Sequence, residues 1–438
     1  QIPLLPWWRN NLVWTLCWGP SLEQVPRQDT GPRTAASYHQ GIPRYKNMTF
    51  WRVLLLLSGL AILMPLVIDI FLPSIPAIAS AYGVDTGEVQ LTLAYLNFGA
   101  ALGQVIYGPL ADRFGRRPVI VSTMVLFTAA GFGSALSPSM EWLNAWRFLQ
   151  GLAAASGMII IRAIVRDLYD GTRATKMLAY TFMTGSIMPI AAPVAGGFLT
   201  VYVGWEFNLH IIGIIGLLVT LGLWVWLDET GEREPNALQI SAMIAAYQEL
   251  LRSRRFFTYA FAGIGPFAGL FAILTSLSSV LIEFMGVSPE MFGLLFAAVM
   301  VGNLASSWLS GRLAESMGGT RLIIIGSVIC LISGIAALGV VLLGWSSPPG
   351  IVLPSLGFMV GFALLIPAAT AGAMSPFPQM AGRASSLIGL AQYGAGAAAS
   401  MVMGLAADGT DLPLSAGLAV CGLLSLFAII LVLTDRKK

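Results

Sequence analysis

The sequence predicts an all-α membrane protein with twelve transmembrane helices, arranged as two six-helix halves with both termini in the cytoplasm. Three observations predict this fold: the composition, the number of long apolar runs, and the placement of lysine and arginine. Of the 438 residues, 56% are hydrophobic and only 10% are charged, whereas a typical soluble domain has about 25% charged residues. So few charges cannot cover a water-exposed surface. This argues against a soluble enzyme or a disordered protein, and a net charge of +3 gives no support for nucleic acid as a partner.

The apolar runs are long enough to cross a bilayer, which takes about 20 residues of helix. Helices are expected because lipid offers no hydrogen-bond partner to an open backbone. The short alternating segments of a membrane β-barrel are missing. The expected spans are residues 51–72, 88–108, 118–137, 143–163, 177–200 and 208–227 in the first half, and 258–281, 291–311, 321–343, 350–371, 384–405 and 413–433 in the second half.

Lysine and arginine cluster in every second loop. The loop after the second span holds Arg113, Arg116 and Arg117, and the chain ends with two lysines after Arg436. The loops after the odd-numbered spans contain neither residue type. Basic loops face the cytoplasm, so the pattern supports an even number of spans and cytoplasmic termini.

The longest polar stretch between spans, residues 228–256, divides the chain. We expect a cytoplasmic linker here, either plain or containing a short amphipathic helix at the membrane surface. It separates an N-terminal six-helix half at 48–227 from a C-terminal half at 257–438. Residues 1–47 precede the first methionine and contain four tryptophans but no possible span. We interpret them as a non-native or flexible segment, with an interfacial tryptophan-rich anchor as the alternative.

A motif repeats once in each half, directly after the second span of that half. GPLADRFGRRP runs from Gly108 to Pro118, and the weaker copy GRLAESMGGTR runs from Gly311 to Arg321. Matching loops in two six-span halves are typical of parallel repeats in secondary transporters.

The Gly108–Pro118 segment resembles the signature loop of the major facilitator superfamily. Three further motifs resemble its drug:proton antiporter branch: DIFLPSIP from Asp69, RFLQG from Arg147, and PIAAPVAGG from Pro189. Ala192 departs from that last motif, which usually has glycine before Pro193. Together the motifs resemble the Bcr/CflA group of drug exporters over residues 48–438. The resemblance implies a monomeric, proton-coupled antiporter in the bacterial inner membrane, which exports amphiphilic drugs such as chloramphenicol or bicyclomycin.

Two charged residues are candidates for proton coupling. Asp69 is the only acidic residue well inside an expected span, and Arg147 is the only lysine or arginine outside the basic clusters and the N-terminal segment. A charge at the bilayer centre costs about 2.5–3.5 kcal/mol on insertion scales, and such residues usually mark an ion path. We expect the two to face each other across a cavity. The alternatives are a boundary carboxylate beside Pro73 and an arginine that reaches to the membrane interface.

The resemblance also assigns a gating loop and an antiporter motif. The gating residues on the cytoplasmic side would be Gly108, Asp112, Arg113, Gly115, Arg116 and Arg117. Asp112 would pair with nearby arginines and with the end of a helix from the other half, since an acid near a helix N-terminus is stabilised. In the fifth span, Pro189, Pro193, Gly196 and Gly197 would close the contact between the halves, although proline and glycine also serve ordinary packing of membrane helices.

The substrate site can only be outlined from residue type. We expect polar, aromatic and flexible methionine side chains within the spans to line it, although each could instead be a packing residue. The candidates are Tyr95, Asn97, Gln104, Met158, Phe267, Phe271, Asn303, Gln392 and Tyr393.

No cofactor or metal is expected, and the protein is not expected to be an enzyme. Its three cysteines and two histidines are scattered, and the sequence has no phosphate-binding loop for an ATP-driven pump. The partners would be protons, membrane lipid and a small-molecule drug. A proton-coupled uptake symporter for a small metabolite is the alternative, because one fold serves both functions.

Overall fold

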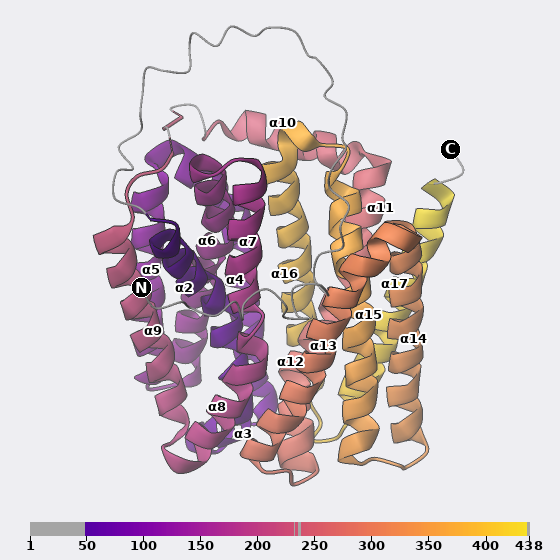
Figure 1. The fold of residues 1–438 in the computed structure, drawn as a ribbon. Helices are drawn as coiled ribbons and strands as arrows, with labels where there is room; N and C mark the ends of the chain where they lie inside the picture. Colours follow the sequence, from indigo (N-terminus) through magenta and orange to yellow (C-terminus); the bar gives the residue numbers. More distant parts are fainter. Residues whose placement is uncertain (1–48, 232, 235–237, 436–438) are drawn as a thin grey trace, which may run out of the picture. The chain divides into compact units, whose positions relative to one another are not determined.

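The computed structural model describes residues 49–231, 233–234 and 238–435, so the expectation for residues 1–47 lies outside the described residues. The described chain is helical and contains no strand. Figure 1 shows two groups of long helices that run in roughly the same direction, with α10 (Ile240–Arg252) lying across one end. We call the end that carries α10 the linker end and the opposite end, which carries α3 (Ile75–Tyr82), the far end.

The first half contains eight α-helices and one short 3-10 helix. In chain order they are α2 (Phe50–Asp69), η1 (Leu72–Ser74), α3, α4 (Thr86–Phe114), α5 (Arg116–Ala135), α6 (Met140–Leu168), α7 (Gly171–Gly185), α8 (Met188–Tyr202) and α9 (Trp205–Trp226). The second half has the same order of long helices. Its elements are α11 (Arg254–Ala262), α12 (Ile264–Ser278), the π-helix η2 (Ser279–Phe284), α13 (Pro289–Met317), α14 (Gly319–Leu342), α15 (Pro348–Met374), the 3-10 helix η3 (Pro378–Met380), α16 (Ala381–Ala406) and α17 (Leu412–Asp435).

Eleven helical segments of the described chain are long and apolar enough to cross a membrane. The last helix, α17, contributes a shorter apolar stretch, Leu412–Phe427. Several segments extend beyond the predicted spans: the first runs from Phe50 to Tyr82 rather than ending at residue 72. A helix of 29 residues such as α4 is about 43 Å long, more than the hydrocarbon core of about 30 Å, so its ends extend past the lipid tails.

Three of the spanning segments are interrupted. The first breaks after Asp69, where η1 carries a proline in its first turn. The fifth breaks between Gly185 and Met188, where Pro189 starts α8. The seventh breaks at Gly263, between α11 and α12. Proline suits the first turn of a helix because no internal partner is lost there, so each proline restarts a helix instead of ending the span.

The two halves pack on each other through two pairs of helices, α4 with α16 and α8 with α13. At the far end the backbones come close at glycines. An added Cβ on Gly87 of α4 would lie 2.5 Å from the Gly404 carbonyl oxygen of α16. Gln90 Nε2 also donates to Ser279 Oγ across the halves at 2.9 Å. The far end is therefore closed.

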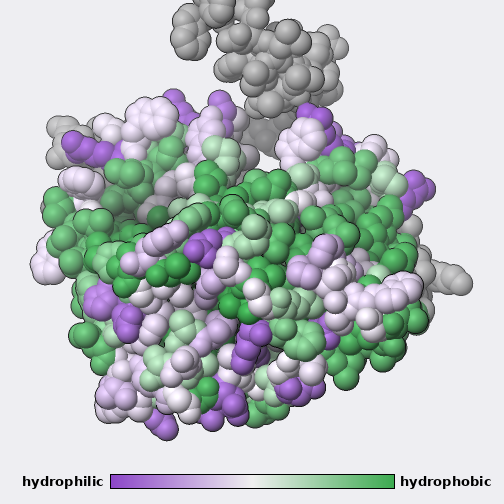
Figure 2. Space-filling model, turned by 90° about the horizontal axis from the view of Figure 1, so that it is seen from below, coloured by the Kyte–Doolittle hydropathy of each residue, from purple (hydrophilic) through white to green (hydrophobic). Residues whose placement is uncertain are grey.

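The surface has the polarity expected of a membrane-spanning bundle. Figure 2 shows the far-end face, where hydrophilic residues are scattered over the middle and hydrophobic residues gather along parts of the rim. Large apolar side chains on the flanks of the helices are exposed, including Trp224, Leu218 and Ile332. Such flanks are suited to contact with lipid tails.

Candidate functional site

A central cavity of about 360 Å³ lies between the halves, within the size range of sites for small molecules. Helices of both halves line it: α2, α6, α7 and α8 from the first, and α12, α13, α15 and α16 from the second. The breaks of the first and fifth spans both border it, through Asp69 and through Gly185 and Pro189. Interrupted helices near the middle of a transporter expose backbone and side-chain groups to a substrate.

Asp69 is the acidic residue in the lining of this cavity. It is the last residue of α2, and its side chain is only 4% exposed. The carboxyl group makes no hydrogen bond or ion pair with any other described residue. A buried carboxylate without a partner is costly, so stability does not explain its position.

Arg147 of α6 is fully buried and lies against the same helix break. Its Nη1 donates to the Val67 carbonyl oxygen of α2 and to Gln150 Oε1, both at 3.1 Å. Its guanidinium carbon lies 3.9 Å from the ring centre of Phe71, in the range of a cation–π contact. Nε and Nη2 have no partner among the described residues. Arg147 does not line the central cavity, and no hydrogen bond or ion pair joins it to Asp69.

Aromatic side chains form one wall of the cavity. Phe267 of α12 lies 5.9 Å from Phe271 and 5.9 Å from Tyr393 of α16, measured between ring centres, and 5.6 Å from Phe362 of α15. Rings at these separations stabilise one another beyond simple burial. The wall is therefore apolar, with the Tyr393 hydroxyl as a polar group.

The structure brings some of the predicted substrate residues to this cavity and not others. Met158, Phe267, Phe271, Asn303 and Tyr393 line it together with Asp69. Asn303 Nδ2 donates to the Met359 carbonyl oxygen at 3.2 Å, which holds its side chain in place.

The remaining candidates lie elsewhere. Tyr95 is 40% exposed on the outer side of α4, and Asn97 is fully buried with no partner for its amide atoms. Gln104 packs against Gly389 of α16 and lines a different cavity at the linker end. Gln392 is half-buried near Gly263 and is not part of the lining.

Sequence reasoning missed several lining residues, most of them apolar. They are Met64, Pro65, Ile68, Phe182, Leu270, Leu274, Met300, Met359 and Phe362. Helical spacing from correctly identified residues could have found some of them: Met300 lies three residues before Asn303, and Leu274 lies three residues after Phe271. Nothing in the sequence marks Met359, because apolar residues cover every side of α15.

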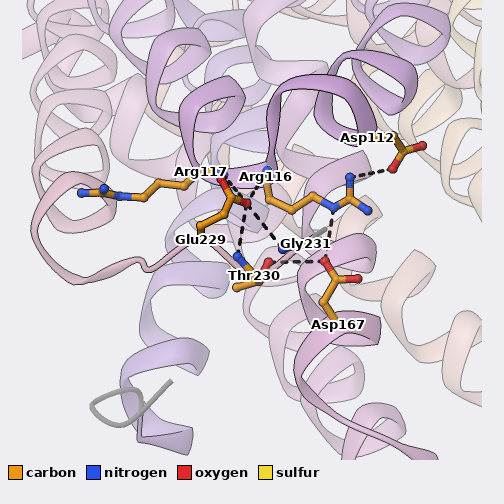
Figure 3. A network of polar contacts seen from close by, with 7 residues as sticks. All are labelled: Asp112, Arg116, Arg117, Asp167, Glu229, Thr230 and Gly231. Atoms are coloured by element: carbon orange, nitrogen blue, oxygen red, sulfur yellow. Dashed lines mark hydrogen bonds and ion pairs between the residues drawn. The ribbon is translucent and has the colours of Figure 1, made fainter. Parts of the chain in front are cut away.

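The signature loop forms a polar network at the linker end, between α4, α5 and α6 (Figure 3). Arg116 donates from Nη1 to Asp112 Oδ1 at 2.6 Å and from Nε to Asp167 Oδ2 at 3.2 Å. Thr230 Oγ1 donates to the same oxygen of Asp167 at 3.3 Å. Gly115 makes the turn with φ of 103°, a conformation that strongly favours glycine.

Glu229, three residues after the end of α9, holds the first turn of α5. Its Oε1 accepts from the backbone nitrogens of Arg116 at 2.7 Å and Arg117 at 3.5 Å, and from those of Thr230 at 3.2 Å and Gly231 at 3.4 Å. A carboxylate is favourable at a helix N-terminus. This contact could not be predicted, because Glu229 and Arg116 are 113 residues apart in the sequence.

A cavity of about 510 Å³ separates the halves at the linker end. Asp112 lines it from the first half and Arg383 from the start of α16, and in this structure Asp112 pairs with Arg116 rather than with a helix of the second half. Burial raises the pKa of Tyr247, which also lines the cavity, so its phenol is neutral at physiological pH. Arg162 Nη1 donates to Ser385 Oγ and connects the halves here.

The predicted antiporter motif lies where the fifth segment meets the second half. An added Cβ on Gly197 would lie 2.4 Å from the Pro289 carbonyl oxygen, and one on Gly293 would lie 2.6 Å from that of Pro193. Gly196 packs in the same way on the Ile70 carbonyl oxygen of the first half. These contacts bring α8 and α13 together at the far end, and Pro189 borders the central cavity.

Known proteins resemble this chain along most of its length. A bicyclomycin resistance protein homolog from Haemophilus influenzae is 30% identical over 379 residues, which cover 86% of this chain and 94% of the relative. A chloramphenicol resistance protein from Pseudomonas aeruginosa is 29% identical and covers 76% and 79% of the two chains. Multidrug resistance protein D from Escherichia coli is 28% identical and covers 76% and 83%. These names agree with the resemblance to drug exporters found in the motifs.

Solved structures share the fold at low sequence identity. A D-xylose-proton symporter matches with a TM-score of 0.70 and 15% identity, covering 86% of this chain and 97% of the other. A bacterial homolog of the lysosomal transporter Spinster, in an inward-facing conformation, also matches with a TM-score of 0.70, at 17% identity and coverages of 90% and 99%. The family model of the Major Facilitator Superfamily matches residues 57–401. The chain therefore belongs to the major facilitator superfamily and is a multi-pass membrane transporter, not an enzyme.

Proposed function

We propose that this transporter is a proton-coupled antiporter that exports amphiphilic drugs or antibiotics from the cytoplasm. The observation that carries the proposal is Asp69, a buried carboxyl group without a partner on the wall of a cavity between the halves. The names of the relatives support drug export. We also propose twelve spans in the bacterial inner membrane, with both termini and the linker end in the cytoplasm, because α10 and the arginine-rich loops lie at that end.

The chemistry of the cavity favours amphiphiles over sugars. Most of its lining is methionine, phenylalanine, leucine and proline, and the polar side chains are Asp69, Ser186, Asn303, Ser307 and Tyr393. A sugar requires many hydrogen-bonding groups for its hydroxyls, whereas an apolar wall with a few polar groups fits a drug-like molecule. Flexible methionine side chains adapt to ligands of different shapes. This lining counts against the alternative of an uptake symporter for a sugar-like metabolite.

A transport cycle follows from the two protonation states of Asp69. When the far end is open, a proton from outside neutralises the carboxyl group and removes the cost of burying its charge. The carrier then closes at the far end and opens at the linker end. Drug that enters the central cavity favours release of the proton to the cytoplasm, and the loaded carrier turns outward. The structure, with its closed far end and its cavity at the linker end, corresponds to the stage that receives drug.

Arg147 acts through the helix that carries Asp69. It holds the last turn of α2 through the Val67 carbonyl oxygen and the Phe71 ring. Its two unpartnered donors remain available to the ionised carboxylate when the break between α2 and η1 changes conformation. A positive charge close by would favour the ionised form of Asp69, so Arg147 would help to release the proton.

Closure of the linker end would use the signature loop. Asp112 and the first turn of α16 face the same cavity from opposite halves. As the cavity closes, the carboxylate of Asp112 approaches the N-terminus of α16, where a negative charge is favourable by about 0.3–1 kcal/mol. The network around Arg116 keeps that carboxylate in position within the first half.

The first test is drug transport in proteoliposomes under an imposed pH gradient. The assay compares the wild-type protein, Asp69→Asn and Asp85→Asn, a matched change at an acid directly before α4. We expect gradient-driven accumulation of a fluorescent drug by wild type and Asp85→Asn. Asp69→Asn should lose it because asparagine carries no proton, while its melting temperature and gel-filtration profile stay unchanged. Gradient-driven transport by Asp69→Asn would contradict the proposal.

A further inference from the structure

A second cavity lies inside the second half, toward the linker end. Its volume is about 580 Å³, and α11, α13, α14 and α15 enclose it. We call it the second-half vestibule and define it by Arg255, Tyr259, Ser307, Gly311, Gly319 and Ser375. It is distinct from the linker-end cavity, whose lining comes from both halves.

The vestibule adjoins the central cavity along one face of α13. Met300 and Asn303 line the central cavity, Ser307 lines both cavities, and Gly311 and Ala314 line the vestibule. These residues are spaced three or four apart, so they form one continuous stripe of the helix. On the opposite wall, α15 passes from Phe362 at the central cavity to Gly372 in the vestibule.

The internal repeat places different residues at the turn that borders this space in the second half and at the equivalent turn of the first half. Gly115 and Gly318 occupy the same position in the two motif copies, and both make the turn with positive φ, 103° and 79°. The next residue is Arg116 in the first copy, where it is buried and bound to two carboxylates. In the second copy it is Gly319, which has no side chain and borders the vestibule.

The chemistry of the vestibule differs from that of the central cavity. Hydroxyl groups from Ser307, Ser310, Thr320 and Ser375 replace the aromatic wall, and the Tyr259 hydroxyl lies 3.4 Å from Thr320 Oγ1. Arg255 is exposed, lies 5.9 Å above the Tyr259 ring, and is the charged residue in the described lining. A positive charge with hydroxyl donors and acceptors favours polar uncharged groups and anions, and repels cations.

We propose that the second-half vestibule is a second substrate-binding site, which takes uncharged or anionic amphiphiles on their way to the central cavity. This inference rests on the proposed drug transport, and it adds a binding site and a charge preference to it. The apolar part of such a ligand would contact the Ala and Gly surface of α13 and α15, while its polar part would meet the hydroxyl groups and Arg255. Ser307 marks the point at which it passes into the central cavity.

Binding stoichiometry tests the second site without requiring transport. Equilibrium dialysis would use purified full-length protein with radiolabelled chloramphenicol, which is uncharged. We expect the wild-type protein to bind two molecules of chloramphenicol. Gly319→Leu and Gly311→Leu should each bind one, because their side chains fill the vestibule from different helices. An added Cβ on Gly319 meets only Ala368 Cβ at 3.6 Å, and one on Gly311 meets nothing within 4 Å, so both variants should fold. Gly339→Leu, also uncrowded and also on α14, is the matched control and should keep two equivalents.

The charge preference of the vestibule is tested by Arg255→Gln. The anionic succinate ester of chloramphenicol should bind the second site of wild type more tightly than that of Arg255→Gln, by roughly threefold. This is the factor for a unit charge about 6 Å away in a water-like medium. The matched control is Arg321→Gln, which removes a basic residue that does not line the vestibule. The cationic dye ethidium should show the opposite change in Arg255→Gln.

The outcomes separate this inference from the proposed antiport. A single equivalent in wild type, two equivalents in every variant, or no binding of any of the three probes would overturn the vestibule site. Two equivalents in wild type, with one lost in both filled variants, would support it even if no pH-driven transport were found. In that case the antiporter proposal would fail and the vestibule would remain as a binding site. Conversely, pH-driven export with one bound equivalent would reject the vestibule alone.

Discussion

Asp69 and Arg147 are buried charged groups that the chain does not pair with each other. Burial of a charge without a full set of partners lowers stability, so residues chosen for stability alone would not be placed here. Both residues contact or end the same helix, α2, beside its break. Their value to the protein is therefore best sought in transport.

Arg147→Met is expected to abolish proton-coupled export without lowering stability. Methionine has a similar length and needs no hydrogen-bond partners, and replacing buried ionic groups with apolar ones is often neutral or stabilising. The measurement pairs pH-driven transport with the melting temperature in detergent. Gln150→Met is the matched control, because it removes one acceptor from Arg147 but leaves the charge. Retained transport in Arg147→Met, or a large loss of stability, would count against this role.

Glu229→Gln is expected to destabilise the first half by about 0.3–1 kcal/mol, the usual range for a negative charge at a helix N-terminus. The charged acceptor at the N-terminus of α5 is lost, while the neighbouring backbone stays in place. The measurement is the melting temperature, compared with that of Asp228→Asn, which removes an exposed acid one residue earlier. The difference between the two variants separates the effect at the helix N-terminus from a general loss of negative charge. Equal melting temperatures for both variants would show that Glu229 contributes no more than its neighbour.

At the scale of the elements, the breaks in the spanning helices determine where the central cavity lies. The breaks of the first and fifth segments both border the central cavity, whereas uninterrupted α4 contributes nothing to its lining. The close glycine contacts between α8 and α13 have a different consequence. They fix how near the two halves can come at the far end, because backbone meets backbone there.

Gly293→Ala is expected to weaken far-end closure. Its Cβ would lie 2.6 Å from the Pro193 carbonyl oxygen, so α8 and α13 would have to separate. Gly302→Ala on the same helix is the control, since its Cβ meets only a Leu356 side chain at 3.3 Å. In a variant without native cysteines, spin labels at the exposed residues Tyr202 and Met291 would report the distance between the halves. An unchanged distance distribution in Gly293→Ala would contradict this account.

The sequence was sufficient to locate the apolar helices and to single out Asp69 and Arg147 as buried, but not to assign the faces of the helices. Spans, linker and repeat follow from hydrophobicity and charge, and the lone acid and arginine stand out from an apolar background. Within a membrane helix, however, lipid-facing and cavity-facing residues are both apolar. The spacing of apolar residues therefore does not show which face of the helix is turned toward the cavity. Tyr95 and Asn97 illustrate this: one is exposed on the flank of α4 and the other is buried. The contacts of Glu229 could not be predicted because they depend on the packing of distant segments.

At the scale of the whole molecule, the halves are in contact at the far end and separated by a cavity at the linker end. Alternating access requires the reverse arrangement at another stage of the cycle. Two glycines, Gly108 and Gly382, line the linker-end cavity from opposite halves. An added Cβ on either has nothing within 4 Å, so both positions accept cysteine.

A Gly108→Cys, Gly382→Cys double variant is expected to trap the closed linker end. A disulfide should form when the linker end closes during turnover, and it should stop transport until a reductant is added. Gel mobility and drug transport, measured before and after oxidation, check this, with each single variant as control. Full transport by the oxidised double variant would contradict closure at this place.

The two ends differ in the kind of contact that closes them. The far-end contacts described here join uncharged groups, namely Gly87 with Gly404, Gly197 with Pro289, and Gln90 with Ser279. The charged residues that line the linker-end cavity are Asp112, Arg116, Arg162, Arg166, Glu234 and Arg383. Mobile ions screen exposed charges over about 8 Å at physiological ionic strength and have little effect on close contact between backbones. Ionic strength in the compartment that bathes the linker end should therefore shift the balance between the two orientations more than the same change on the other side.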